Sequence, residues 1–86
     1  MKVEVKLFGA FRDHQADGRV TLDLAEGARV GDVRHALEAY AGAHWPGFCP
    51  KLLGYSAFAS EKAVLREADA IPDDGRMAVL PPVSGG

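Results

Sequence analysis

The last residues of the sequence carry the group with the clearest chemical potential. After Leu80 the chain reads Pro81-Pro82-Val83-Ser84-Gly85-Gly86, so two prolines precede two terminal glycines. Prolines favour a stiff, extended backbone, which predicts that this segment projects from the domain. Because glycine has no Cβ, Gly85 and Gly86 leave the carboxylate free of side chains and able to enter a narrow channel of another protein. The sequence therefore indicates chemistry at the Gly86 carboxylate; the alternative is an ordinary frayed chain end.

The other reactive side chains give weaker signals. The histidines fall in a predicted loop, a helix and a crossover without the spacing of a metal site; they are His14, His35 and His44. Cys49 has no basic residue beside it, so we expect a packed or inert thiol. The acidic pairs Glu67/Asp69 and Asp73/Asp74 are interpreted as solvated surface in turns. We expect no bound metal or cofactor in this chain.

Composition narrows the class of protein. The 86 residues suit one domain, and 10 Lys and Arg against 12 Asp and Glu give a net charge of −2. Without a basic excess, nucleic-acid binding is not expected. A single cysteine excludes an intrachain disulfide framework. The charged start is unlike a signal peptide, and no apolar run approaches the ~20 residues that span a bilayer. We therefore expect a cytoplasmic protein without membrane association.

Hydrophobic periodicity predicts the elements that position the terminal segment. Apolar residues alternate with polar ones over 3–7 and again over 20–24, which predicts two strands joined as a β-hairpin through a polar loop. From Val30 to Ala41 apolar residues recur every three or four positions, which predicts an amphipathic helix ending near Gly42. Because Arg29 offers no capping oxygen, tertiary contacts must hold the start of this helix.

The second half of the chain is less regular. Residues 43–54 contain two prolines and two glycines among apolar side chains, and we interpret them as a packed irregular crossover. Strands are predicted at 55–60, 63–65 and 76–80, with a turn at 72–75 before the last one. The order of elements favours an α+β fold in which a sheet of about five strands covers one main helix. It suits a domain over 1–80, with the first and last strands side by side at the centre, followed by a flexible tail over 81–86.

These features together resemble a known family. The ending Pro81-Pro82-Val83-Ser84-Gly85-Gly86 is similar to that of the small, sulfur-carrying subunit of molybdopterin synthase, a ubiquitin-like β-grasp protein. The opening from Val3 to Asp13 is similar to the family's first strand and its apolar-apolar-x-x-Arg-acid exit. Chain length and strand order also match. The thiamine-pathway sulfur carrier belongs to the same group, and the Pro-Pro-Val-Ser-Gly-Gly form favours the molybdopterin member.

The resemblance implies a carrier rather than a catalyst. A ubiquitin-activating-like adenylyltransferase would use ATP and magnesium to adenylate the Gly86 carboxylate, and sulfur from a donor protein would then give a thiocarboxylate. The large synthase subunit would use that sulfur to form the dithiolene of molybdopterin from cyclic pyranopterin monophosphate. The chain would itself be a non-catalytic subunit. The residues that the resemblance places at partner contacts are Phe8, Val64, Leu80, Pro81, Pro82, Val83 and Ser84.

We expect the three apolar residues Phe8, Val64 and Leu80 to form one exposed patch beside the tail, the alternative being burial in the core. For Arg12 and Asp13 two interpretations fit the sequence: they contact a partner at the rim of this patch, or they are solvated charges of a loop. Two stretches depart from the family pattern, Ala57-Phe58-Ala59-Ser60 and Asp74-Gly75-Arg76-Met77. Because such stretches help to select the partner, two other functions stay open. One is a sulfur carrier for thiamine or another product, and the other is a ubiquitin-like modifier conjugated through Gly86.

Overall fold

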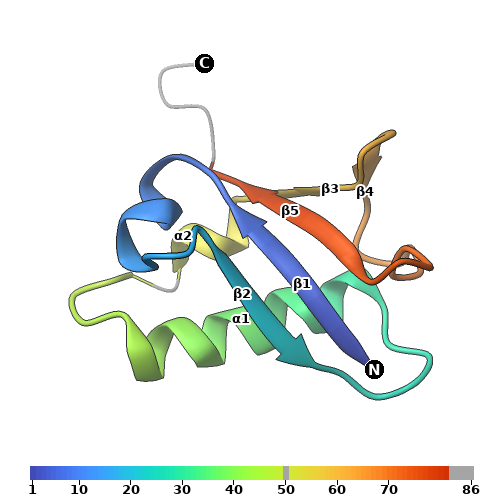
Figure 1. Ribbon diagram of the computed structural model, residues 1–86, viewed down its shortest axis with the longest axis horizontal. Helices are drawn as coiled ribbons and strands as arrows, with labels where there is room; N and C mark the ends of the chain where they lie inside the picture. Colours follow the sequence, from blue (N-terminus) through green and yellow to red (C-terminus); the bar gives the residue numbers. More distant parts are fainter. Residues whose placement is uncertain (50, 82–86) are drawn as a thin grey trace.

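The structure, a computed structural model, describes residues 1–49 and 51–81, and in this part of the chain five strands form one sheet against a long helix (Figure 1). The strands follow the order β2-β1-β5-β3-β4 across the sheet. In chain order the elements are β1 (Lys2–Leu7), the 3-10 helix η1 (Gly9–His14), β2 (Arg19–Asp23), α1 (Val30–His44), α2 (Lys51–Gly54), β3 (Ala57–Ala59), β4 (Val64–Leu65) and β5 (Arg76–Leu80).

The first and last strands lie side by side at the centre of the sheet, as the sequence predicted. β1 and β5 are parallel, with Glu4 opposite Arg76 and Leu7 opposite Val79. Antiparallel partners flank this pair, β2 against β1 and β3 against β5. The two central strands therefore end at the same edge of the sheet (Figure 1). The predicted α+β fold with a mixed five-stranded sheet over one main helix is confirmed.

The connection between β1 and β2 differs from the predicted polar loop. Residues Gly9–His14 form η1, and Phe11 within it is fully buried. The alternation ends at Gly9, whose φ of +59° turns the chain into η1, so Phe8 is exposed and Phe11 lies in the core. A three-residue spacing fits a 3-10 turn better than a strand. The antiparallel pairing of β1 with β2 is nevertheless confirmed.

Contacts from outside α1 hold its start, as its poor cap predicted. The Val30 N–H donates to the carbonyl of Asp69 at 3.0 Å, and the Gly31 N–H donates to the carbonyl of Glu67 at 3.0 Å. The Asp32 carboxylate accepts from the Arg29 N–H at 2.8 Å. These bonds satisfy N–H groups that a helix cannot pair internally, and they fix the 67–69 loop to the helix.

The end of α1 was predicted too early. The helix continues through Gly42 to His44, and Trp45 caps it by donating its N–H to the Ala41 carbonyl at 2.9 Å. Gly42 is exposed, and a Cβ built on it would meet no atom within 4 Å, so nothing around it requires the helix to end there. Burial of Ala41 and Trp45 on either side outweighs the ~1 kcal/mol that glycine costs inside a helix.

The crossover after α1 is packed, as expected, and contains the short helix α2. Leu53 is fully buried, and Arg34 of α1 donates to the carbonyls of Leu53 and Ser56, the latter at 2.8 Å. The same guanidinium lies 4.9 Å from the centre of the Phe58 ring and pairs with Glu67. Arg34 thereby connects α1 to α2, to β3 and to the loop before β5.

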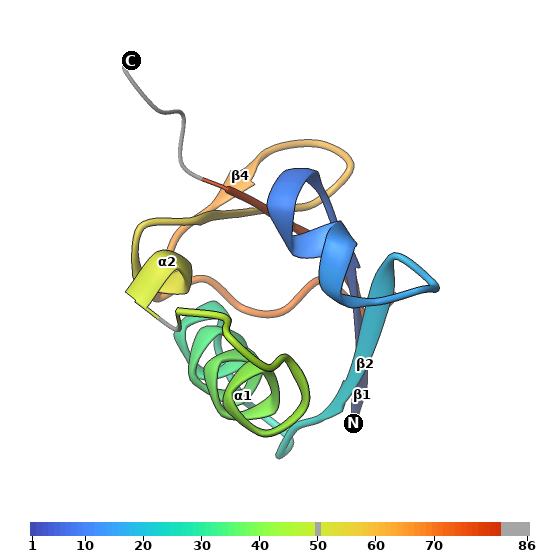
Figure 2. The same ribbon diagram turned by 90° about the vertical axis from the view of Figure 1, so that its left-hand side faces the viewer.

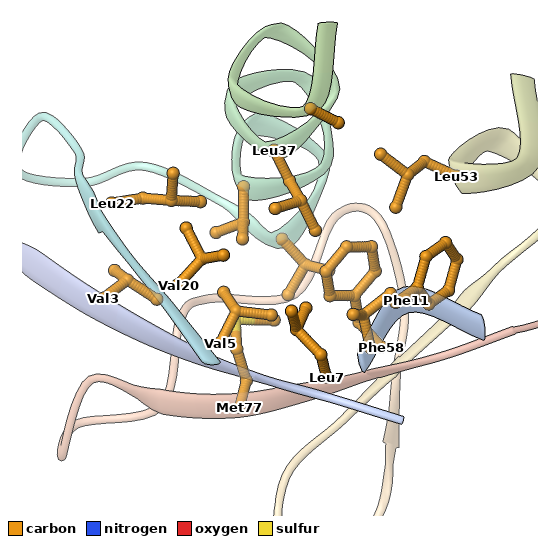
Figure 3. Packing of buried hydrophobic residues seen from close by; sticks show 14 of the residues in the cluster. Val3, Val5, Leu7, Phe11, Val20, Leu22, Leu37, Leu53, Phe58 and Met77 are labelled. Atoms are coloured by element: carbon orange, nitrogen blue, oxygen red, sulfur yellow. The ribbon is translucent and has the colours of Figure 1, made fainter. Parts of the chain in front are cut away.

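The core lies between the sheet and α1, which the end-on view of the helix shows as two layers (Figure 2). Side chains from both layers point toward one another in the close-up (Figure 3). The predicted inward residues of β1 are buried. The fully buried core side chains of largest volume are Phe11, Phe58, Leu7, Leu37, Leu53, Val3, Val5, Val30, Val33 and Val79.

The last turn requires its glycine. Gly75 has φ +69°, and its N–H donates to the Pro72 carbonyl at 2.9 Å, so the predicted 72–75 turn is confirmed. A Cβ on Gly75 would lie 2.8 Å from the Lys2 carbonyl oxygen. Any other residue would push β5 away from β1, which accounts for a glycine at this position.

The strands predicted at 55–60 and 63–65 are present as β3 and β4, and both are shorter than expected.

Candidate functional site

The candidate site begins where β1 and β5 leave the sheet together. Leu7 and Val79 form their last paired position, so Phe8 follows β1 beside Leu80, the last residue of β5. Pro81 comes next, and it is half-buried. Proline cannot donate to a sheet ladder, which explains why β5 ends at this residue. The root of the terminal segment therefore lies at this edge, beside Phe8.

The face of the sheet that is turned away from α1 carries a band of small and apolar residues, which we call the outer face. The register places Ala78 opposite Ala59, and Ala59 opposite Val64. It also places Ala57 opposite Leu80. Paired residues point to the same side of a sheet, so side chains from three strands share this face. Its members are Phe8, Ala57, Ala59, Val64, Ala78 and Leu80.

The structure brings the three predicted patch residues to this face. Val64 is 68% exposed and Phe8 is 38% exposed, whereas Leu80 is half-buried. The alternative of core burial therefore does not hold for Phe8 or Val64. Their binding of a partner stays a prediction.

Charged groups border a shallow hollow in this face. The hollow has a volume of about 400 Å³, and Phe8, Ala59 and Ala78 contribute to its lining. Its charged lining residues are Glu4, Lys6, Glu61 and Arg76. An apolar floor within a polar rim is the usual anatomy of a protein–protein contact surface.

Lys6 connects the charged rim to the apolar part of the outer face. Its Nζ lies 5.4 Å from the centre of the Phe8 ring, within the range of a cation–π contact. Glu4, on the same side of β1, forms an ion pair with Arg19 at 3.7 Å. Glu4 and Lys6 thus have different neighbours, and the ammonium of Lys6 lies closer to the edge where the strands end.

Most of the predicted terminal site lies outside the described residues. Pro82, Val83, Ser84, Gly85 and Gly86 belong to this segment, so their predicted roles stay predictions. Pro81 is within the described part and packs against Gly9. A Cβ built on Gly9 would lie 2.7 Å from Cγ of Pro81.

The remaining candidate residues lie in other places. His14, His35 and His44 are exposed to solvent, and the ring of His14 also stacks on Trp45 with ring centres 5.2 Å apart. Cys49 is exposed, so of the two expected states the packed thiol was wrong, and the inert thiol stays a prediction. Glu67 is more than solvated surface, because it pairs with the half-buried Arg34. Arg12 and Asp13 are exposed in η1.

Within residues 1–49 and 51–81, no group of three or more His, Cys, Asp or Glu side chains is arranged to hold a metal ion. No helix in the same part of the chain has the length and apolar character needed to cross a membrane.

Sequence reasoning missed the alanines that form the floor of the outer face. Ala57, Ala59 and Ala78 leave the backbone of β3 and β5 close to the surface, so the larger Phe8 and Val64 stand out from a flat surround. The signal was present as alanines on both sides of Phe58 in β3 and as one alanine, Ala78, at an outward position of β5. Alternation identifies the residues that a strand buries, but it does not show that small outward residues form a flat surface.

The strand order and the parallel central pair define a ubiquitin-like β-grasp domain. Residues 5–86 match the ThiS family, so the chain belongs to this family of ubiquitin-like sulfur carriers. No curated protein matches the sequence significantly.

Two solved structures from Haloferax volcanii are similar over the whole chain. The crystal structure of SAMP1 aligns with a TM-score of 0.69 and 27% sequence identity, and 100% of each chain is covered. The solution structure of the HVO 2177 protein aligns with a TM-score of 0.71 and 25% identity, covering 100% of this chain and 87% of that one.

Proposed function

We propose that this chain is a sulfur carrier that holds sulfur as a thiocarboxylate on Gly86. The observation that carries the proposal is the family match through residue 86, which includes the side-chain-free ending Gly85-Gly86. The position of Pro81 beside an exposed apolar face supports it, because an enzyme bound there would lie near the root of the terminal segment.

The carboxylate must be activated before it can accept sulfur. An oxygen of the Gly86 carboxylate attacks the α-phosphorus of ATP, the bond to the β,γ-phosphates breaks, and pyrophosphate leaves. Hydrosulfide supplied by a sulfur-donor protein then attacks the acyl carbon, AMP leaves with the carboxylate oxygen, and loss of the proton on sulfur gives the Gly86 thiocarboxylate. An adenylyltransferase supplies the ATP site, the magnesium and the acid–base groups, so this chain contributes the reacting atom and its presentation.

For the destination of the sulfur we propose the dithiolene of molybdopterin, with the large subunit of molybdopterin synthase as the recipient. The ending Pro81-Pro82-Val83-Ser84-Gly85-Gly86 supports this destination over thiamine or another sulfur-containing product. The residues proposed to contact the large subunit and the adenylyltransferase are Phe8, Val64, Leu80, Pro81, Pro82, Val83 and Ser84.

A second function has equal support from the fold. Ubiquitin-like sulfur carriers and ubiquitin-like modifiers share a β-grasp domain, and adenylation of Gly86 would be common to both. In the modifier function a lysine amine of a target protein attacks the activated carbonyl and forms an isopeptide bond. The products differ, so mass spectrometry separates the two functions.

The first experiment examines the protein from its native host. Intact-mass measurement should show the mass increase of one oxygen exchanged for sulfur at Gly86. Lysine-linked adducts of other proteins without any thiocarboxylate would instead establish the modifier.

The second experiment decides the destination. Chemically prepared Gly86 thiocarboxylate, mixed with a large synthase subunit of proven activity and cyclic pyranopterin monophosphate, should yield molybdopterin. Absence of molybdopterin in this reconstitution would overturn the proposed destination and leave the carrier function to be tested with other acceptors.

Addition of one alanine after Gly86 tests the reacting atom directly. The extended chain should fold like the wild type, but its adenylation should be abolished because the carboxylate moves and gains a Cβ beside it. ATP–pyrophosphate exchange measures adenylation, and thermal unfolding checks the fold. Normal exchange by an extended chain that has not been trimmed would contradict the mechanism.

A further inference from the structure

Gly9 and Pro81 meet at the edge where the two central strands end. Phe8 is extended at φ −125° and ψ 158°, and Gly9 at φ +59° then turns the chain into η1. A Cβ built on Gly9 would lie 2.7 Å from Cγ and 3.4 Å from Cδ of Pro81. The pyrrolidine ring therefore occupies the space that a side chain at residue 9 would need.

The Gly9 side of this contact is firmly held. Phe11, two residues further on, is fully buried, and its N–H donates to the Phe8 carbonyl at 3.3 Å. The Leu7 N–H donates to the Gly18 carbonyl at 2.8 Å, which fixes the end of β1. Pro81 has a ring-restricted φ and no N–H to pair with a neighbouring strand. The contact therefore joins Gly9, whose backbone is held by its neighbours, to Pro81, whose backbone has little conformational freedom.

We propose that Gly9 is a positioning residue, which receives the Pro81 ring and thereby sets the direction in which the chain leaves β5 on its way to the reacting carboxylate. This inference rests on the proposed function of Gly86. A larger residue at position 9 would displace the ring and redirect the chain after Leu80. Small displacements at the root matter because efficient reaction requires the reacting group to be oriented.

Backbone strain is the competing explanation for a glycine at residue 9, and the chain offers matched controls for it. Gly27 and Gly47 have φ values of +82° and +78°, and a Cβ on either would meet no atom within 4 Å. Alanine at these positions introduces the same unfavourable backbone conformation without touching Pro81. A comparison of Gly9→Ala with Gly47→Ala therefore separates strain from contact.

The test measures ATP–pyrophosphate exchange with the adenylyltransferase of the source organism, alongside urea unfolding. We expect Gly9→Ala to lose at least as much stability as Gly47→Ala, whereas kcat/KM for the carrier falls about tenfold only in Gly9→Ala. In a Pro81→Ala background the Gly9→Ala change should alter kcat/KM by less than about twofold, because the two residues act through one contact. Equal kcat/KM for Gly9→Ala and Gly47→Ala, or full additivity with Pro81→Ala, would overturn the proposal.

Pro81→Ala by itself provides a variant that leaves Gly9 unstrained. It should lower kcat/KM about as much as Gly9→Ala does, while Pro46→Ala, at an exposed proline between α1 and α2, should match the wild type. Wild-type kcat/KM in Pro81→Ala would refute the positioning role.

A structural readout keeps this inference separate from the proposed function. In the wild-type protein, NMR should show a nuclear Overhauser effect between the Gly9 Hα protons and the Pro81 ring, and the effect should weaken in Gly9→Ala. Its absence in the wild type would overturn the contact whatever the activity. Failure of the wild type to be adenylated, with the effect present, would instead refute the function of Gly86.

Discussion

The two faces of the sheet differ sharply, although the same strands build both. On β1 the inward residues Val3, Val5 and Leu7 are buried, whereas Lys6 on the outer side and Phe8 directly after the strand are exposed. On β3 the fully buried Phe58 stands between Ala57 and Ala59, which belong to the outer face. Large side chains fill one face and small ones leave the other flat.

This difference indicates that the inner face stabilises the domain and that the outer face is available for contacts with other proteins. The inner face packs against α1 and provides the stability of the domain, because apolar burial is the main favourable term in folding. The outer face leaves Phe8 and Val64 in water, and it surrounds them with charged residues. Substitutions on the inner face should therefore change unfolding, and substitutions on the outer face should change association with the adenylyltransferase. The following predictions run from the largest expected effect on stability to the smallest.

Two phenylalanines give the strongest contrast. Phe58→Ala removes a fully buried ring and should lower the free energy of unfolding by about 3–5 kcal/mol. Phe8→Ala removes an exposed ring and should lower it by about 1 kcal/mol or less. Urea unfolding followed by circular dichroism measures both. Similar losses for the two variants would show that the outer face is part of the core.

Arg34→Ala tests the side chain that connects α1 to β3. The carbonyls of Leu53 and Ser56 would lose a charged donor, and Glu67 would lose its partner, so stability should fall by about 2–3 kcal/mol. Arg66→Ala, at an exposed arginine of the neighbouring loop, is the control and should change stability by about 0.5 kcal/mol or less. A neutral Arg34→Ala would mean that apolar packing and the pairing of β3 with β5 and β4 hold this region without the guanidinium.

Leu80→Asp tests the outer face next to the root of the terminal segment. Leu80 is half-buried, so stability should fall by about 1 kcal/mol, but affinity for the adenylyltransferase should fall by about tenfold or more. Isothermal titration calorimetry measures the affinity. Ala39→Asp, at an exposed position of α1, adds the same charge elsewhere and should leave the affinity unchanged. Unchanged affinity in a folded Leu80→Asp would remove this residue from the contact surface.

Val64→Ala should have the smallest effect on the fold. The side chain is 68% exposed on an edge strand, so stability should change by less than about 0.5 kcal/mol. Loss of its methyl groups should weaken binding about threefold to tenfold, and Val64→Ile should retain the affinity. Wild-type binding by Val64→Ala would place β4 outside the contact surface.

The sequence predicted the parts of the fold that follow a regular period. Alternation located β1 and β2, and the three-to-four spacing located α1, because one buried face imposes its period on each element. The end of α1 could not be predicted, since the signal from Gly42 was opposed by burial of Trp45, which depends on η1 and the crossover. β3 was predicted too long because Tyr55 is a good strand residue, whereas its N–H donates to the Leu52 carbonyl at 3.2 Å and so belongs to the turn that ends α2.

The candidate site was predicted unevenly for a related reason. Exposure of Phe8 and Val64 follows from the resemblance and from their outward positions in the strand pattern. The contact of Gly9 with Pro81 joins residues 72 positions apart, and it depends on the parallel pairing of β1 with β5. No local pattern reports such a contact, because it forms only after the strands have been arranged in space.

The central position of β5 has a consequence for how the protein is made. Among the five strands of this sheet β5 comes last in the chain, yet it lies between β1 and β3, so the middle of the sheet is missing until residue 80 has left the ribosome. Pairings between distant parts of a chain form late and slowly in folding. A chain truncated before β5 therefore lacks the strand that joins β1 to β3, so the outer face forms only after residues 76–80 have taken their place in the sheet.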